Sequence, residues 1–241
     1  GTDVSGIGNT FTANNIAAVD QTTDTCTNNF ATLNALAKGS SSTFSEGNLK
    51  NTSGGSVNNT STATIGVSSG KWYWEYKINS VNYVMMGITT NESSAANTDV
   101  MTNFPGANYV KTAYAAEFRY NTDGGAYSTD TYGGTQSNGD IFQIALDLDN
   151  NFIYMGVNGT YFNSGNPTSG ASGTGAAKAI VAGVTYFPMM ITLNSNMDIN
   201  FGSPPYSESG GETDGNSYGN FAHAVPSGYY ALCTKNLAEY G

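Results

Sequence analysis

The sequence predicts an all-β protein, an antiparallel sandwich with long loops and negligible helix. Apolar and polar residues alternate along several segments, most strictly at residues 71–78 (KWYWEYKI), as expected of a strand that buries one face. Turn-forming residues separate these segments at short intervals. The chain also has 30 Gly, 16 Tyr and 11 Phe, a composition that suits many strands and many tight turns.

The N-terminal part is expected to differ from the rest of the chain. We expect residues 1–37 to form an extended lead-in that packs on the domain or on a neighbour, and residues 38–241 to form the sandwich. Apolar residues spaced three apart within residues 26–37 predict an irregular segment with one face on the core. Weak alternation over residues 38–70 predicts two or three short strands.

The later strands follow from alternation and from short apolar runs. They are expected at residues 71–78, 84–89, 114–120, 141–148, 152–157, 180–184, 186–193 and 197–201. Residues 139–162 should hold a hairpin, because Asp149, Asn150 and Asn151 tolerate turn conformations and Asn158-Gly159 fits a type I′ turn. Long loops, which often carry function, are expected at 90–111, 121–138, 163–179 and 202–219.

Charge and hydropathy argue against several classes of function. The net charge is −10 with only 8 Lys and Arg, which disfavours binding to nucleic-acid phosphates and to anionic membranes. No apolar run approaches the ~20 residues of a membrane-spanning helix, and no signal peptide is evident. Charged residues make up only 11% of the chain, as is typical of extracellular β-proteins and virion parts. Because the first residue is not Met, we expect processing or a longer parent polypeptide.

Cys26 and Cys233 lie near opposite ends of the chain. They could form a disulfide if the terminal strands lie side by side, or they could remain two free thiols. With the single His223 they are too few for a Cys-rich metal site. No G-x-S-x-G motif accompanies this histidine, so no nucleophilic triad is expected.

Asp147 and Asp149 stand two residues apart and should point to the same face of one strand. Such a carboxylate pair could serve a glycosidase or hold Ca²⁺. The structural alternative is that Asp147 binds backbone donors at a sheet end while Asp149 forms the turn. No Glu lies near them to complete a glycosidase cluster, so we expect no catalytic residues.

Aromatic residues in or beside loops are the best candidates for ligand binding, because aromatic faces stack on sugar C–H surfaces and nearby carboxylates bind hydroxyls. The candidates are Tyr83, Tyr109, Asp123, Tyr127, Asp130 and Tyr132. The alternative for the tyrosines is packing at the rim of the core. Ca²⁺ could bind the oxygen-rich loop around Asp123 and Asp130, although EF-hand spacing is absent. No other cofactor is expected.

Several blocks of sequence, in order, resemble the SPRY domain. They are GKWYWEYKI at 70–78, MGI at 86–88, GDIFQIALDLD at 139–149, NG at 158–159, FP at 187–188 and INFGSPPY at 199–206. This resemblance covers roughly residues 40–206. It implies a concanavalin A-like, bent antiparallel sandwich and a structural role for Asp147 and Asp149.

The flanking blocks resemble a SPRY-like module of tailed-bacteriophage structural proteins, found in tail-fibre and other virion-surface polypeptides. They are DVSGIGNTFTANNI at 3–16, TNNFATLNAL at 27–36, YMGVNGTYFNSGNP at 154–167 and PSGYYALCTKNL at 226–237. The first residues also resemble the end of a laminin-G-like lectin module. Cys26 departs from the pattern, which has Pro at that position.

The phage resemblance implies a non-enzymatic virion structural or adhesion protein, either a tail-fibre or a capsid-surface module, located on the virion surface or otherwise extracellular. Its loops would bind a host-cell glycan or other virion subunits, and such parts are expected to form homo-oligomers. The main alternative is a secreted carbohydrate-binding lectin domain of a bacterial surface protein. A glycan hydrolase is the least favoured interpretation.

Overall fold

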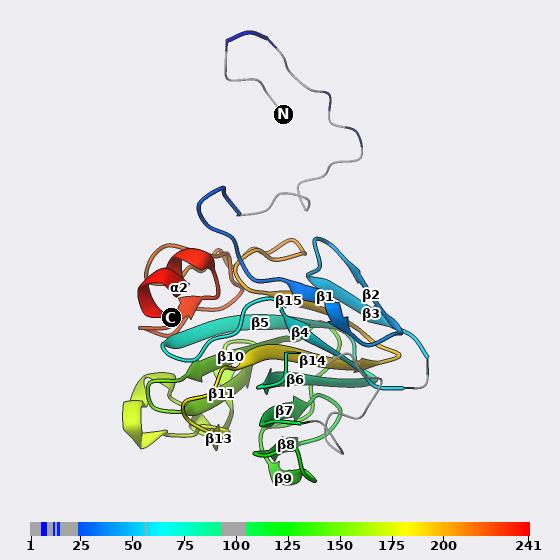
Figure 1. Cartoon of the computed structure of the whole chain (residues 1–241), viewed down its shortest axis with the longest axis vertical. Helices are drawn as coiled ribbons and strands as arrows, with labels where there is room; N and C mark the ends of the chain where they lie inside the picture. Colours follow the sequence, from blue (N-terminus) through cyan, green and yellow to red (C-terminus); the bar gives the residue numbers. More distant parts are fainter. Residues whose placement is uncertain (1–5, 9–11, 13, 15–23, 56, 93–104) are drawn as a thin grey trace.

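The computed structural model describes residues 6–8, 12, 14, 24–55, 57–92 and 105–241. Within these ranges, two β-sheets face each other across a common core (Figure 1). The strands pair antiparallel, except that β16 lies parallel to β5 at the C-terminal end of the fold. The expected all-β antiparallel sandwich is therefore confirmed.

One sheet has seven strands and the other has nine. The seven-stranded sheet has the order β1 (Leu33–Lys38), β4 (Asn59–Ala63), β14 (Phe187–Leu193), β6 (Tyr83–Thr89), β7 (Asn108–Thr112), β8 (Glu117–Asn121) and β9 (Ser128–Thr131). The nine-stranded sheet has the order β12 (Thr160–Tyr161), β11 (Phe152–Val157), β10 (Ile141–Asp147), β5 (Lys71–Ser80), β15 (Asn196–Asn200), β3 (Lys50–Ser53) and β2 (Ser42–Ser45). In addition, β13 (Lys178–Ala179) pairs with β11, and β16 (Tyr230–Ala231) pairs with β5.

Helical structure is limited to short pieces in the described ranges. The helix α2 (Thr234–Tyr240) follows β16, and two 3₁₀ segments, η2 (Phe162–Ser164) and η3 (Pro167–Ser172), lie in the loop expected at 163–179. Asn166 caps η3, because its side chain accepts a hydrogen bond from the backbone N–H of Thr168. No described helix is both long and apolar enough to cross a membrane.

The core is built on the alternation at residues 71–78. Trp72, Trp74 and Tyr76 of β5 are fully buried between the sheets, and β10 places an apolar residue directly opposite each of them. Cross-strand rows of this kind are the main stabilising contacts of a sheet. The Tyr76 hydroxyl also donates to the carbonyl of Met189 in the other sheet at 2.8 Å.

The outer face of β5 is buried as well, so the expectation that this strand buries one face is wrong. The chain between β15 and α2 covers that face. Phe221 packs edge-on against Tyr73, with ring centroids 5.1 Å apart. The fully buried carboxylate of Glu75 accepts hydrogen bonds from the backbone N–H groups of Ala222 and His223 at 3.0 and 2.9 Å. Tyr73 and Glu75 therefore hold a covering segment rather than face water.

The hairpin expected at residues 139–162 is confirmed in register and in turn chemistry. β10 pairs antiparallel with β11, with Asp147 opposite Phe152. Asn158 and Gly159 have positive φ values of 49° and 82°, as both central residues of a type I′ turn require. This turn connects β11 to β12, whose Thr160 lies opposite Val157.

The boundary expected between residues 37 and 38 falls inside β1, which pairs with β4 through Leu33 opposite Ala63. Phe30 and Ala31 also belong to the core, with exposed fractions of 7% and 0%. The sandwich therefore begins before residue 38. Most of the expected lead-in before residue 24 lies outside the described residues.

Three further expectations about elements are corrected. The loops expected at 90–111 and 121–138 contain β7 and β9, although residues 93–104 lie outside the described residues. β9 is an exposed edge strand of polar residues, so it has no apolar alternation to reveal it. Residues 180–184 are not a strand, because Gly183 adopts a φ of +72° and the chain bends there.

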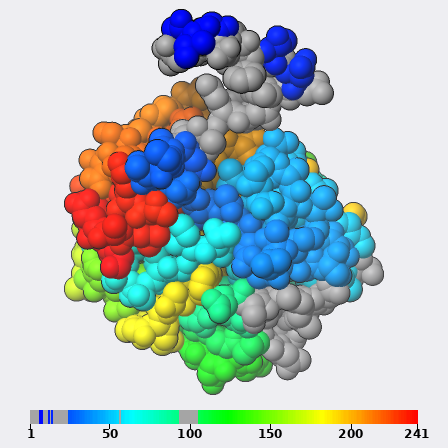
Figure 2. Space-filling view, turned by 45° about the horizontal axis from the view of Figure 1, so that its top comes forward, coloured from blue at the N-terminus to red at the C-terminus, as the bar shows by residue number. Residues whose placement is uncertain are grey.

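The two cysteines are free. The terminal segments do lie side by side, as the blue and red surfaces in Figure 2 show, and Phe30 forms an antiparallel bridge with Cys233. Cys26 lies four residues before Phe30 and is exposed, whereas Cys233 is buried. The expected proximity of the ends is confirmed, but it brings Phe30 rather than Cys26 to the second cysteine.

Candidate functional site

Five half-buried residues gather on the outer face of the seven-stranded sheet, and we call them the tyrosine–arginine cluster. They are Tyr83, Tyr114, Glu117, Arg119 and Tyr127. Tyr83 begins β6, while Glu117 and Arg119 share one face of β8 because they stand two residues apart. Tyr114 lies between β7 and β8, and Tyr127 directly precedes β9.

Arg119 connects the members of the cluster. Its Nε and Nη2 donate to one carboxylate oxygen of Glu117 at 3.0 and 2.8 Å, and its Nη1 donates to the Tyr83 hydroxyl at 3.3 Å. The guanidinium lies 5.1 Å from the centroid of the Tyr127 ring, within the range of a cation–π contact. Tyr83 also stacks on Tyr114, with centroids 4.6 Å apart and planes 25° apart.

The charge states in the cluster are set by burial and by these partners. Burial, the largest single effect, lowers the pKa of Arg119, but the Glu117 hydrogen bonds and the contributions of Tyr114 and Tyr83 together outweigh it, so this pKa is raised. Burial, together with the neighbouring Tyr83 phenol, raises the pKa of Tyr114, which stays protonated. The cluster therefore presents an Arg119 guanidinium paired with Glu117 and a protonated Tyr114 phenol.

Four fully buried apolar side chains lie beneath the cluster. Met85, Val110, Met189 and Ile191 form a second hydrophobic cluster on the outer side of the sheet, separate from the core of the sandwich. Tyr83, Tyr114 and Tyr127 pack on its margin. This apolar base holds the rings in place.

The structure divides the predicted tyrosines into two pairs. Tyr83 and Tyr127 are brought together through Arg119. Tyr109 and Tyr132 are buried, with exposed fractions of 1% and 3%, so their expected place at a ligand-binding loop is wrong. Tyr109 lies in β7 opposite Ile88 and therefore faces the core. Tyr132 donates its hydroxyl proton to backbone carbonyls across the sandwich, among them that of Gly175 at 3.2 Å.

Both predicted loop aspartates make structural contacts. Asp130 forms an ion pair with Lys178 at 2.7 Å, and the same ammonium lies 3.8 Å from the Tyr120 ring. Because β9 and β13 belong to different sheets, this contact fastens one edge of the sandwich. Asp123 accepts a hydrogen bond from the Gly125 N–H at 3.1 Å within its own turn. Among the described residues, no group of three His, Cys, Asp or Glu residues could hold the Ca²⁺ considered above.

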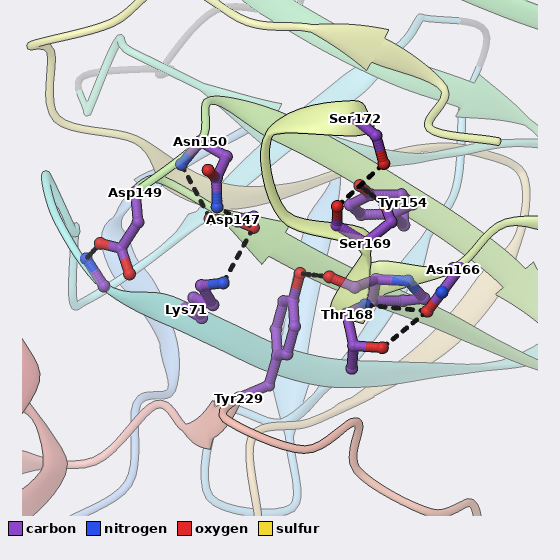
Figure 3. Close-up of polar contacts among 12 residues, drawn as sticks. Lys71, Asp147, Asp149, Asn150, Tyr154, Asn166, Thr168, Ser169, Ser172 and Tyr229 are labelled. Atoms are coloured by element: carbon purple, nitrogen blue, oxygen red, sulfur yellow. Dashed lines mark hydrogen bonds and ion pairs between the residues drawn. The ribbon is translucent and has the colours of Figure 1, made fainter. Parts of the chain in front are cut away.

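Asp147 and Asp149 both have structural roles, as the alternative given above expects, but the side chain of Asp147 holds the turn and that of Asp149 binds the backbone beside the start of β5 (Figure 3). Asp147 accepts hydrogen bonds from the backbone and side-chain nitrogens of Asn150, both at 2.9 Å, and pairs with Lys71 at 3.2 Å. Asp149 accepts a hydrogen bond from the Gly70 N–H at 3.0 Å. These contacts place both carboxylates in the support of the hairpin turn.

Sequence reasoning missed Tyr114, Glu117 and Arg119. One signal was available, because Arg119 is the only arginine among the 241 residues, and it alternates with Glu117 in the expected strand. A lone arginine on a strand face rarely stays unpaired. Its contacts with Tyr83 and Tyr127 depend on strand register and could not be read from spacing.

The fold is an all-β sandwich that resembles the SPRY domain. The SPRY domain of human HERC1 is similar in structure, with a TM-score of 0.51 and 17% sequence identity over 69% of this chain and 96% of that chain. At this identity the likeness shows the fold alone. No protein-family model matches the sequence, and no curated protein matches it.

Proposed function

We propose that the chain is a non-enzymatic structural and adhesion module of a tailed-bacteriophage virion surface, in which the tyrosine–arginine cluster contacts a neighbouring virion subunit. The observation that carries the contact is the placement of Tyr83, Tyr127 and the only arginine together over an apolar base. Tyr and Arg dominate the energetic centres of protein interfaces. The resemblance of residues 27–36 and 226–237 to phage modules supports the virion context.

A protein partner fits this cluster better than a glycan does. The Arg119 donors are largely engaged by Glu117 and Tyr83, so few free polar groups remain for sugar hydroxyls. Large rigid rings that pack on apolar side chains instead suit a dry contact. Because virion parts assemble symmetrically, the neighbouring subunit is taken to be a second copy of this chain.

Two measurements test the proposal. Mass spectrometry of purified particles should detect peptides of this chain, whereas finding the chain only in the culture medium would favour the secreted-lectin alternative.

Light scattering after size exclusion should detect an oligomer, and Tyr127→Ala should weaken its association by roughly tenfold or more. Tyr218→Ala is the matched control, because Tyr218 makes a comparable cation–π contact with Lys235 at 5.6 Å. Equal association of both variants and the unmodified chain would contradict the contact.

A further inference from the structure

A pocket of about 300 Å³ opens where the C-terminal segment meets the nine-stranded sheet, and we call it the Lys71 pocket. It is lined by Gly70, Lys71, Asp149, Gly228, Tyr230 and Tyr240. These residues come from four separate parts of the chain, so only the folded sandwich assembles them. None of them belongs to the tyrosine–arginine cluster. We infer that this pocket binds a single neutral sugar residue.

The polar groups of the pocket are held in place before any ligand arrives (Figure 3). One carboxylate oxygen of Asp149 accepts the Gly70 N–H at 3.0 Å, which leaves the second oxygen without a bond in the structure. The Lys71 ammonium lies 3.2 Å from the fully buried Asp147 carboxylate, and 23% of the Lys71 side chain is exposed. A fixed acceptor and a fixed donor therefore face the same space, which reduces the entropy lost on binding.

Two tyrosines form the aromatic side of the pocket. Tyr230 and Tyr240 stack in parallel, with ring centroids 3.7 Å apart and planes 9° apart. Gly70 allows the close approach of the C-terminal helix, because a Cβ at this position would lie 2.5 Å from the carbonyl oxygen of Tyr240. Any larger residue at position 70 would separate the aromatic pair from Lys71 and Asp149.

The chemistry of the lining selects the class of ligand. A sugar ring carries hydroxyls that both donate and accept, together with a C–H face that packs against tyrosine. An ammonium and a carboxylate side by side satisfy such hydroxyls, whereas the net negative charge of Asp147, Asp149 and Lys71 repels an acidic sugar or a phosphate. The volume lies at the lower end of the range for ligand pockets, which suits one ring rather than an oligosaccharide.

Saturation-transfer NMR tests the inference with the full chain and the methyl glycosides of glucose, galactose, mannose, N-acetylglucosamine and N-acetylgalactosamine. A contact of one ring should give a dissociation constant of about 1 mM for at least one of them. Asp149→Asn keeps the acceptor for Gly70 but replaces the free oxygen with a donor, so it should weaken binding by roughly tenfold. Tyr240→Leu should weaken it as well.

Asp123→Asn is the matched control, because Asp123 makes the same kind of turn bond to a glycine N–H but lines no part of this pocket. It should bind sugar as the unmodified chain does. Absence of saturation transfer from all five sugars would overturn the inference, and so would equal binding by Asp149→Asn. The result is independent of the proposed subunit contact, because Tyr127→Ala should weaken oligomer formation and leave sugar binding unchanged.

Discussion

Glu75→Gln tests whether a buried carboxylate holds the covering segment to the nine-stranded sheet. One Glu75 oxygen accepts from the Ala222 N–H and from Asn200 Nδ2, at 3.0 and 3.3 Å. The other accepts from the His223 N–H and the Tyr73 hydroxyl, at 2.9 and 2.8 Å. A glutamine amide has only one oxygen, so in either orientation its NH₂ group faces two donors.

The less costly of the two orientations of the glutamine amide determines how much stability the substitution loses. Asn200 cannot flip its amide without losing its bonds to the Gly202 N–H and the Asn220 carbonyl. The Tyr73 hydroxyl can rotate and accept, so the NH₂ group should turn toward it and leave the His223 N–H unpaired. A buried unpaired donor costs about 1–3 kcal/mol, and the remaining bonds lose their charge assistance. Relief from burying a charge offsets part of this, so we expect a loss of about 2 kcal/mol.

Urea unfolding at neutral pH measures this loss, which should also lower the melting temperature by about 4–8 °C for a chain of this size. Glu212→Gln is the matched control, because it removes the same charge from an exposed side chain in the same covering segment. It should change the free energy of unfolding by less than about 0.5 kcal/mol. A Glu75→Gln variant as stable as Glu212→Gln would refute the reasoning.

The pH dependence of the same variant gives a second readout. Burial raises the pKa of Glu75 in the folded state above its ordinary value. As the pH falls, the folded chain therefore binds this proton at a higher pH than the unfolded chain does. The free energy of unfolding of the unmodified protein rises through that range. The difference in free energy of unfolding between the unmodified protein and Glu75→Gln should therefore widen as the pH falls from 7 toward about 4.3, the ordinary pKa of a glutamate carboxyl.

Three further predictions concern single residues. The Lys111 ammonium donates to the carbonyls of Ala115 and Gly134, and burial lowers its pKa to about 8. Stability should therefore rise by up to about 1.4 kcal/mol per pH unit between roughly pH 8 and 10, and urea unfolding of Lys111→Met should lack this rise. Gly159→Ala should cost about 1–2 kcal/mol in thermal unfolding, because φ is +82° there, whereas Gly54→Ala should cost less, since neither positive φ nor a close neighbour constrains that position. A thiol reagent should modify one cysteine in the native chain and two in denaturant, because Cys26 is exposed whereas Cys233 is buried, and burial raises the pKa of its thiol. Rapid native reaction of both cysteines would contradict the packing of Cys233.

Local pattern alone determined the sandwich and its central hairpin. The alternation of Trp72, Trp74 and Tyr76 has a period of two, which only a strand can bury on one side. Asn158-Gly159 specifies its turn because both residues accept positive φ. The roles of Asp147 and Asp149 could also be foreseen as structural, since both act within a few residues of their own turn or at the adjacent strand end.

Only the tertiary structure decided which tyrosines are accessible. The sequence places Tyr109 and Tyr132 in or beside loops. In the structure, the register of β7 directs Tyr109 into the core, and hydrogen bonds across the sandwich hold Tyr132 there. Tyr83 and Tyr127 meet through Arg119 only because β6, β7 and β8 are neighbours in one sheet. Such contacts depend on pairing between distant strands, and local sequence pattern does not encode that pairing.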